Sequence, residues 1–119
     1  MTAVLKTKLS GSTDGLPIKV AATATTGTTI HTSTSSTTDG DYDEIWIWAF
    51  NSSSSAVLLT IEFGGTSDPD QIIEITIPSQ EGLFPIIPGL ILQNSKAVTA
   101  FAGTANVITL SGFVNRISE

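Results

Sequence analysis

The sequence predicts an all-β protein: a two-sheet antiparallel β-sandwich of about eight strands that is jelly-roll-like and carries an extended N-terminal arm. From Leu16 onward, short apolar runs alternate with turn clusters at intervals of about ten residues, which is typical of sandwiches and barrels. Ser and Thr make up about a quarter of the residues and favour strands and turns over helices. No window shows helical periodicity with capping residues.

The chain has 119 residues, a length suited to one domain with one core. Residues 1–15 are polar, contain glycine and show no periodicity, so we expect them to form an extended arm outside the core. Residues 16–119 are expected to form the sandwich domain. The expected strands are LPIKVAA (16–22), TTIHT (28–32), EIWIWAFN (44–51), AVLLTIEF (56–63), QIIEITIP (71–78), GLFPIIPGLILQN (82–94), KAVTAFA (96–102) and NVITLSGFVNRI (106–117).

Alternation within these strands assigns one face of each to the core. In AVLLTIEF, for example, Val57, Leu59 and Ile61 fall on the same side. Pro85 and Pro88 interrupt the longest apolar run, and proline in a strand belongs at a sheet edge or a bulge. Each well-buried Ile, Leu or Phe contributes about 1.5–3 kcal/mol, so these faces can fold the chain without a metal or a disulfide.

The net charge of −6 argues against a phosphate-binding surface and therefore against a nucleic-acid partner. The N-terminal part differs, because residues 1–38 carry Lys6, Lys8 and Lys19 against Asp14 alone. We hypothesise that Lys6 and Lys8 dock the arm on an acidic surface of a partner.

Cysteine is absent, which excludes disulfides, thiolate metal sites and cysteine nucleophiles. The start, MTAVLKTKLSGS, lacks the apolar core of a secretion signal, and no apolar run is long enough to cross a membrane. We therefore expect a protein without a membrane partner that stays in the cytoplasm where it is made, or is assembled there into a larger particle.

The acidic stretch DGDYDE before the aromatic strand is a candidate calcium site. Asp39, Asp41 and Asp43 fall at alternate positions, like the first oxygen ligands of a calcium loop. The required glycine and glutamate are replaced by Glu44 and Phe50, so the full motif is absent. We favour a solvated acidic turn that leads into the strand, and a cation site of another kind stays open.

The remaining candidates for catalysis are isolated. His31 is the only histidine, lies in the polar run TTIHTSTSS, and is expected to be exposed and without a catalytic role. Glu62 and Glu74 lie on the polar faces of their strands, where we expect solvated carboxylates rather than a glycosidase pair. No serine lies in a GxSxG motif. We therefore expect a protein that has no enzymatic activity and binds neither a metal nor a cofactor.

The strand EIWIWAFN is apolar on both faces, with Trp46, Trp48 and Phe50 on one and Ile45 and Ile47 on the other. A strand of a two-sheet sandwich normally has one face in water. Three interpretations stay open for the aromatic face: cover by the arm or a loop of the same chain, contact with another subunit or partner, or a platform for a carbohydrate ligand.

Several segments resemble the small all-β capsid decoration (cement) proteins of tailed bacteriophages. The resemblance covers GSTDGLPIKVAATAT, LTIEFGG and IPGLILQNSKAVTAFAGTANVITLSGFVNRI, and so touches much of the chain from residue 11 to residue 117. These segments correspond to expected strands and turns, and they contain no catalytic motif.

The resemblance implies a non-enzymatic virion protein that binds the major capsid protein on the exterior of the phage head. It also implies a homo-oligomer, a trimer in this family, that is assembled in the host cytoplasm and locks neighbouring shell subunits together. A neck or tail-completion protein and a carbohydrate-binding head projection are the alternatives. The family has no motif for the residues that grip the shell.

Overall fold

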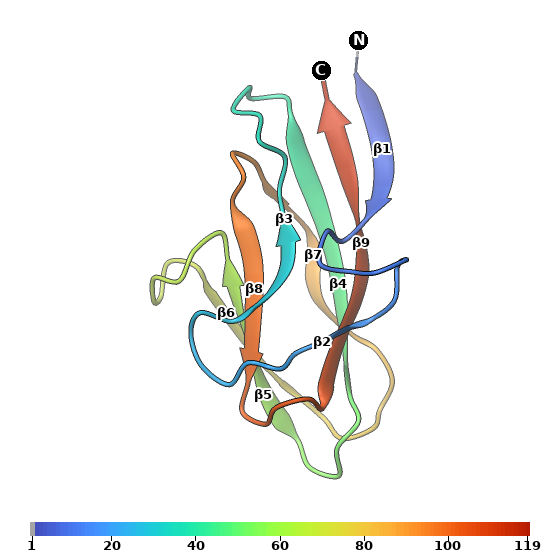
Figure 1. Ribbon diagram of the computed structural model, residues 1–119, viewed down its shortest axis with the longest axis vertical. Helices are drawn as coiled ribbons and strands as arrows, with labels where there is room; N and C mark the ends of the chain where they lie inside the picture. Colours follow the sequence, from blue (N-terminus) through green and yellow to red (C-terminus); the bar gives the residue numbers. More distant parts are fainter. Residues whose placement is uncertain (1) are drawn as a thin grey trace.

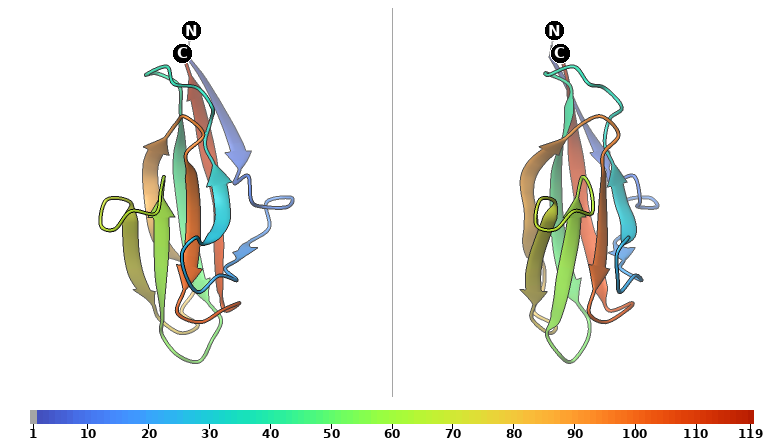
Figure 2. Two further views of the ribbon diagram at one scale, coloured as in Figure 1. Left: turned by 60° about the vertical axis from the view of Figure 1, so that its left-hand side comes forward. Right: turned by 90° about the vertical axis from the view of Figure 1, so that its left-hand side faces the viewer.

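The computed structural model describes residues 2–119, which form nine strands and no helix. None of these residues belongs to a helix that could cross a bilayer. The strands pack as two layers in an elongated body of 49 × 28 × 20 Å (Figures 1 and 2). They are β1 (Ala3–Lys8), β2 (Ile18–Lys19), β3 (Thr28–Thr32), β4 (Tyr42–Asn51), β5 (Val57–Phe63), β6 (Ile72–Ile77), β7 (Phe84–Leu92), β8 (Ala97–Ala102) and β9 (Ile108–Ser118).

The strand pairs are nested. β1 and β2 both pair with β9, β3 pairs with β8, β4 with β7, and β5 with β6, all antiparallel. The chain is therefore one long hairpin rolled into two sheets, which is the jelly-roll arrangement. Sheet A has the order β1-β9-β4-β7 with β2 also on β9, and sheet B has the order β3-β8-β5-β6. The expected all-β sandwich is confirmed, with β1 as a strand beyond the eight expected.

The core lies between the two sheets and is built from alternate residues of the strands. In β4, Ile45 and Ile47 point inward and are fully buried. Leu59 and Ile61 of β5 face them from sheet B and are also fully buried. The predicted core faces of these strands are thus correct, and burial of β-branched and leucine side chains holds the two layers together.

The two prolines of β7 lie at a sheet edge, as expected. β7 pairs only with β4 and forms one edge of sheet A. Pro88 pairs with Trp46 and Pro85 with Trp48, each next to a shift in register. Because proline has no N–H to donate, the edge and its irregular steps accommodate both residues without loss of ladder hydrogen bonds.

The N-terminal segment differs in part from the expected arm. Ala3–Lys8 is extended, but it hydrogen-bonds along β9 as the edge strand β1. The next residues cross to sheet B, where Gly11 N donates to Ile30 O at 2.9 Å. Leu9 is only 1% exposed and belongs to the core, so the expectation that residues 1–15 stay outside the core is wrong at this residue.

Candidate functional site

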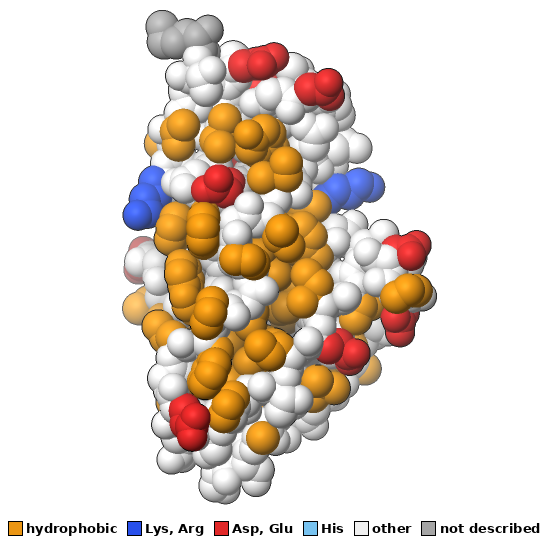
Figure 3. All heavy atoms as spheres, turned by 180° about the vertical axis from the view of Figure 1, so that it is seen from behind, with side chains coloured by type: hydrophobic (Ala, Val, Ile, Leu, Met, Phe, Trp, Pro, Cys, Tyr) orange, Lys and Arg blue, Asp and Glu red, His pale blue; other side chains and the backbone are white. Residues whose placement is uncertain are grey.

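The outer face of sheet A carries the aromatic residues that the sequence singles out. The alternation that buries Ile45 and Ile47 places Trp46, Trp48 and Phe50 on the opposite side of β4, where each is partly exposed. Figure 3 views the molecule from behind, and apolar side chains cover the middle of this surface with an acidic side chain among them. The outer face of sheet A therefore carries apolar side chains at the surface of the molecule.

A third ring comes from β9, where Phe113 lies directly opposite Trp46. The ring centroids of Trp46, Trp48 and Phe113 are 6.0–6.4 Å apart, and their planes differ by 16–28°. We call these three side chains the aromatic platform. Sequence reasoning missed Phe113, although the same alternation in TLSGFVNRI places it on this face.

The rings lie flat against the sheet. A Cβ on Gly89 of β7 would lie 2.7, 3.0 and 3.2 Å from three adjacent ring atoms of Trp46. Three nearly equal distances mean that Gly89 faces the flat side of the indole rather than its edge. Because the other two rings are nearly parallel to Trp46, the platform presents broad apolar surfaces outward.

Polar groups border the platform on the same face. Glu44 Oε1 accepts hydrogen bonds from Asn115 Nδ2 at 3.0 Å and from Trp46 Nε1 at 2.8 Å, and these bonds lower the pKa of Glu44. Lys6 Nζ lies 4.3 Å from the centroid of the Phe113 ring, a cation–π contact. The platform thus has a carboxylate and an ammonium group at its border.

The other residues named from the sequence lie near this face but do not form part of the platform. Phe50 is on the same side of β4, opposite Thr109. Lys8 is exposed at the end of β1. Because β1 lies beside β9 within sheet A, the backbone of the N-terminal strand lies next to the aromatic face rather than over it, and the Lys6 side chain reaches Phe113. The apolar surface in Figure 3 therefore remains on the outside of the molecule.

His31 is buried, contrary to the expectation of an exposed residue. It is 1% exposed, and its Nε2 lies 2.7 Å from Oδ2 of Asp43. The cause is a bulge in β3: the register shifts between Thr29 and His31, so Ile30 and His31 are both buried. Simple alternation would have placed His31 in solvent.

Asp43 is also buried, so the expected solvated turn is wrong at this acid. Asp43 is fully buried and accepts from Nε and Nη2 of Arg116, at 2.7 and 2.9 Å, and from Thr34 N at 3.1 Å. Burial acts to raise the pKa of Asp43, but the hydrogen bonds from Arg116 and His31 outweigh it and lower the pKa. The carboxylate is an anchor that joins β3 of sheet B to β4 and β9 of sheet A.

The other acids of the candidate cation site, the alternative to a solvated turn, lie apart from Asp43. Asp41 accepts from Ser36 Oγ at 2.9 Å and from the backbone N–H of Glu119 at 2.8 Å, whereas Asp39 is exposed. Within residues 2–119, no three His, Asp or Glu side chains are grouped so that they could hold a metal ion. The DGDYDE stretch serves the structure of this end of the sandwich.

Glu62 is buried on the outer side of sheet B, contrary to the expectation of a solvated carboxylate. It is 1% exposed and accepts from Thr25 Oγ1 at 2.5 Å, Thr99 Oγ1 at 2.6 Å and Gly27 N at 2.7 Å. Burial acts to raise its pKa, but these three donors outweigh burial and lower the pKa. Glu74 is exposed, as expected. Glu62 therefore holds the loop before β3 against the sheet.

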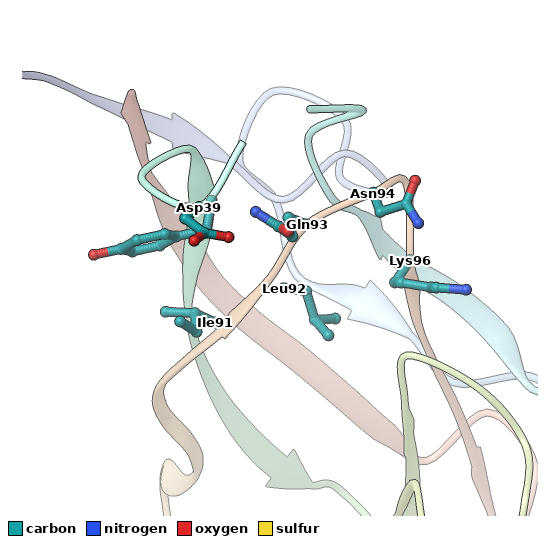
Figure 4. Close-up of a pocket in the computed structure, with 7 residues that line it drawn as sticks. Asp39, Ile91, Leu92, Gln93, Asn94 and Lys96 are labelled. Atoms are coloured by element: carbon teal, nitrogen blue, oxygen red, sulfur yellow. The ribbon is translucent and has the colours of Figure 1, made fainter. Parts of the chain in front are cut away.

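An open hollow of about 490 Å³ lies where β7 ends, and Figure 4 shows its lining. Asp39 and Ile91 lie on one side of the ribbon at the end of β7, and Leu92 and Lys96 lie on the other side. The charged groups do not converge on one point, and the hollow has no buried acid or base at its floor. Its lining residues are Asp39, Tyr42, Ile91, Leu92, Gln93, Asn94 and Lys96.

Comparison with known proteins finds no family model, no curated protein and no solved structure that matches this chain. The residues themselves indicate what the surface can do. The buried ionisable groups His31, Asp43 and Glu62 are held by hydrogen bonds within the chain. The rings of the aromatic platform, by contrast, lie at the surface and are partly exposed.

Proposed function

We propose that this protein is a structural component of a virion, a capsid decoration protein of a tailed bacteriophage without enzymatic activity. It binds the major capsid protein on the outer surface of the head, which is assembled in the host cytoplasm, and it acts as a homo-oligomer, a trimer. The observation that carries the proposal is the partly exposed aromatic platform on the outer face of a jelly roll. Neither a nucleic acid nor a membrane is a partner in this function.

The platform suits a protein interface. Tryptophan and phenylalanine are enriched at the centres of interfaces, where flat, rigid rings exclude water at a small cost in conformational entropy. Trp46 is already fixed by Gly89 beneath it and by its hydrogen bond to Glu44, so it needs little ordering when a partner binds. Such a preorganised surface favours tight binding of a partner.

Attachment to an assembled shell stabilises it by mass action. A ligand that binds only the assembled lattice contributes RT ln(1 + [L]/Kd), and several linked subunits strengthen binding through avidity. Lys8 is exposed and Lys6 lies over Phe113, so the basic edge of sheet A adjoins the platform. We propose that this edge meets acidic groups of the shell protein.

Sedimentation of the purified protein tests the contact role of the platform. The wild type is expected to sediment as an oligomer, and Trp48→Glu is expected to shift it toward the monomer, because a charge replaces a ring at the interface. Leu58→Glu is the control, since Leu58 is 45% exposed and lies on the outer side of β5 in sheet B. A wild type that stays monomeric at high concentration would contradict the interface role.

The number of copies per particle distinguishes decoration from the other virion roles. Quantitative mass spectrometry of purified particles is expected to give on the order of hundreds of copies, as a lattice-covering ligand requires. A dozen or fewer copies would instead support a neck, tail-completion or vertex protein.

Carbohydrate binding is the second candidate, because polar groups border the platform. Sugar rings stack on flat aromatic surfaces, and the carboxylate of Glu44 and the amide of Asn115 lie beside Trp46 to meet hydroxyl groups. Binding of the purified protein to a glycan array, lost in a Trp46→Ala variant, would favour a head projection that recognises a glycan. Absence of saturable glycan binding would favour the protein interface.

A further inference from the structure

The three residues after β1 form a strap that ties the N-terminal strand to the edge of β3. Ser10 N donates to Nδ1 of His31 at 2.9 Å, and Thr32 N donates to Oγ of Ser10 at 2.7 Å. Gly11 N donates to Ile30 O, and Leu9 is buried in the core. A side-chain acceptor on His31 thus holds the centre of the strap.

The neighbours of His31 fix which ring nitrogen carries the proton. Asp43 accepts from Arg116 and Thr34, so it is an ionised acceptor. His31 Nε2, 2.7 Å from Asp43 Oδ2, must therefore carry the hydrogen. Its Nδ1 has a free lone pair, and this lone pair accepts the N–H of Ser10.

We propose that residues 9–11 are an acid-sensitive strap, which leaves β3 when His31 takes up a second proton on Nδ1. In the protonated ring both nitrogens are donors. The Nδ1–H would then face the N–H of Ser10, and two donors cannot share a hydrogen bond at that separation. The ring cannot turn away, because Asp43 holds Nε2 on the other side. Ser10 and Gly11, the exposed residues of the strap, are the part that moves.

The charges around His31 set the direction of the pH dependence. Burial lowers the pKa of His31 most strongly; Asp43 of β4 raises it, Arg116 of β9 lowers it, and the net effect is a pKa below 6.5. Just before β8, the carbonyl of Lys96 accepts a hydrogen bond from Ser33 N, and the Lys96 side chain is exposed. The neutral ring thus stabilises the closed strap above pH 6.5, and this stabilisation is lost as the pH falls.

Opening has a structural consequence at the edge of sheet B. Ile30 O and Thr32 N lose the partners that the strap supplies. Unpaired backbone groups on an edge strand are a template for another strand. Acid therefore exposes a pairing edge on β3, whatever the function of the aromatic platform.

NMR on the intact chain tests the strap, because His31 is the only histidine and its imidazole signals are unambiguous. At neutral pH the nitrogen shifts are expected to show the Nε2–H tautomer. As the pH falls from 6.5 toward the lowered pKa of His31, the protection factors of the Ser10 and Gly11 amides are expected to fall about tenfold per pH unit. Core amides of β5 should keep their protection. An Nδ1–H tautomer, or unchanged protection when the ring is fully protonated, would overturn the proposal.

A His31→Gln variant separates this titration from that of Asp43. Its side-chain amide can donate to Asp43 but takes up no proton, so any protection of the strap should no longer depend on pH above 3.8, the value from which the pKa of Asp43 is lowered. If the variant loses protection with the same pH profile as the wild type, another group drives the opening and the proposal fails. The wild-type measurement decides the question even if this variant does not fold.

Discussion

Gly89 of β7 lies under the flat side of the Trp46 indole of β4, so closely that a Cβ on residue 89 would come within 2.7 Å of Cζ2. Its backbone also has a φ of +81°, a conformation that residues with a side chain adopt with strain. Both conditions require glycine at this position. The pair thus explains how a tryptophan can lie flat on an edge strand.

Gly89→Ala is expected to lower the free energy of unfolding by about 2–4 kcal/mol, because the methyl group collides with the indole and strains the backbone. Urea denaturation followed by tryptophan fluorescence measures the loss. Gly15→Ala is the control: Gly15 has a φ of +84° with nothing within 4 Å of its Cβ position. This control should cost only about 1 kcal/mol. Equal losses would mean that backbone strain accounts for both.

Asp43→Asn is expected to destabilise the protein by about 2–4 kcal/mol, since it leaves Arg116 and His31 without the charge that pairs them across the two sheets. Asp39→Asn is the control, because Asp39 is exposed in the loop that precedes β4 and its substitution should change stability by less than about 0.5 kcal/mol. Thermal denaturation of both variants at neutral pH gives the comparison. A loss in Asp43→Asn no greater than in the control would argue against a structural role.

Alternation in the sequence was sufficient for the sheets and for most of their faces. The alternation predicts that Ile45 and Ile47 point inward. Continued two residues toward the start of β4, it also places Asp43 on the inward face, and Asp43 is indeed buried. Because Asp43 stands among other acidic residues, the sequence instead suggests a solvated turn at this position. Its partner Arg116 is 73 positions away, and only the pairing of β4 with β9 brings the two together.

Departures from regular geometry could not be predicted from periodicity. His31 is buried because of a bulge, which turns one residue to the other face of the strand. The residue types around His31 do not indicate where this bulge lies. Glu62 lies on the polar face of β5, as its position indicates, but residues Thr25 and Gly27 of a distant loop cover it. Loop cover depends on tertiary packing, and strand patterns carry no information about it.

Glu62→Gln is expected to cost about 1–3 kcal/mol at neutral pH, because an amide N–H would face donors where a carboxylate now accepts three hydrogen bonds. The lowered pKa of Glu62 means that its contribution is present above pH 4.5 and is lost as the pH falls below that value. The difference between wild type and variant should therefore narrow in acid. Glu74→Gln, on the exposed side of β6, is the control. A difference that is constant with pH would exclude an ionised Glu62.

Leu9→Ala is expected to lower the free energy of unfolding by about 2–4 kcal/mol, since the side chain of this strap residue is 1% exposed and packs in the core. Leu16→Ala is the control within the same connection between β1 and β2. Leu16 is 61% exposed, so its removal should cost less than about 0.5 kcal/mol. Urea denaturation of the two variants measures the difference. If both substitutions are neutral, the Leu9 side chain does not contribute to the core, and the strap would have to be held by its hydrogen bonds to β3 alone.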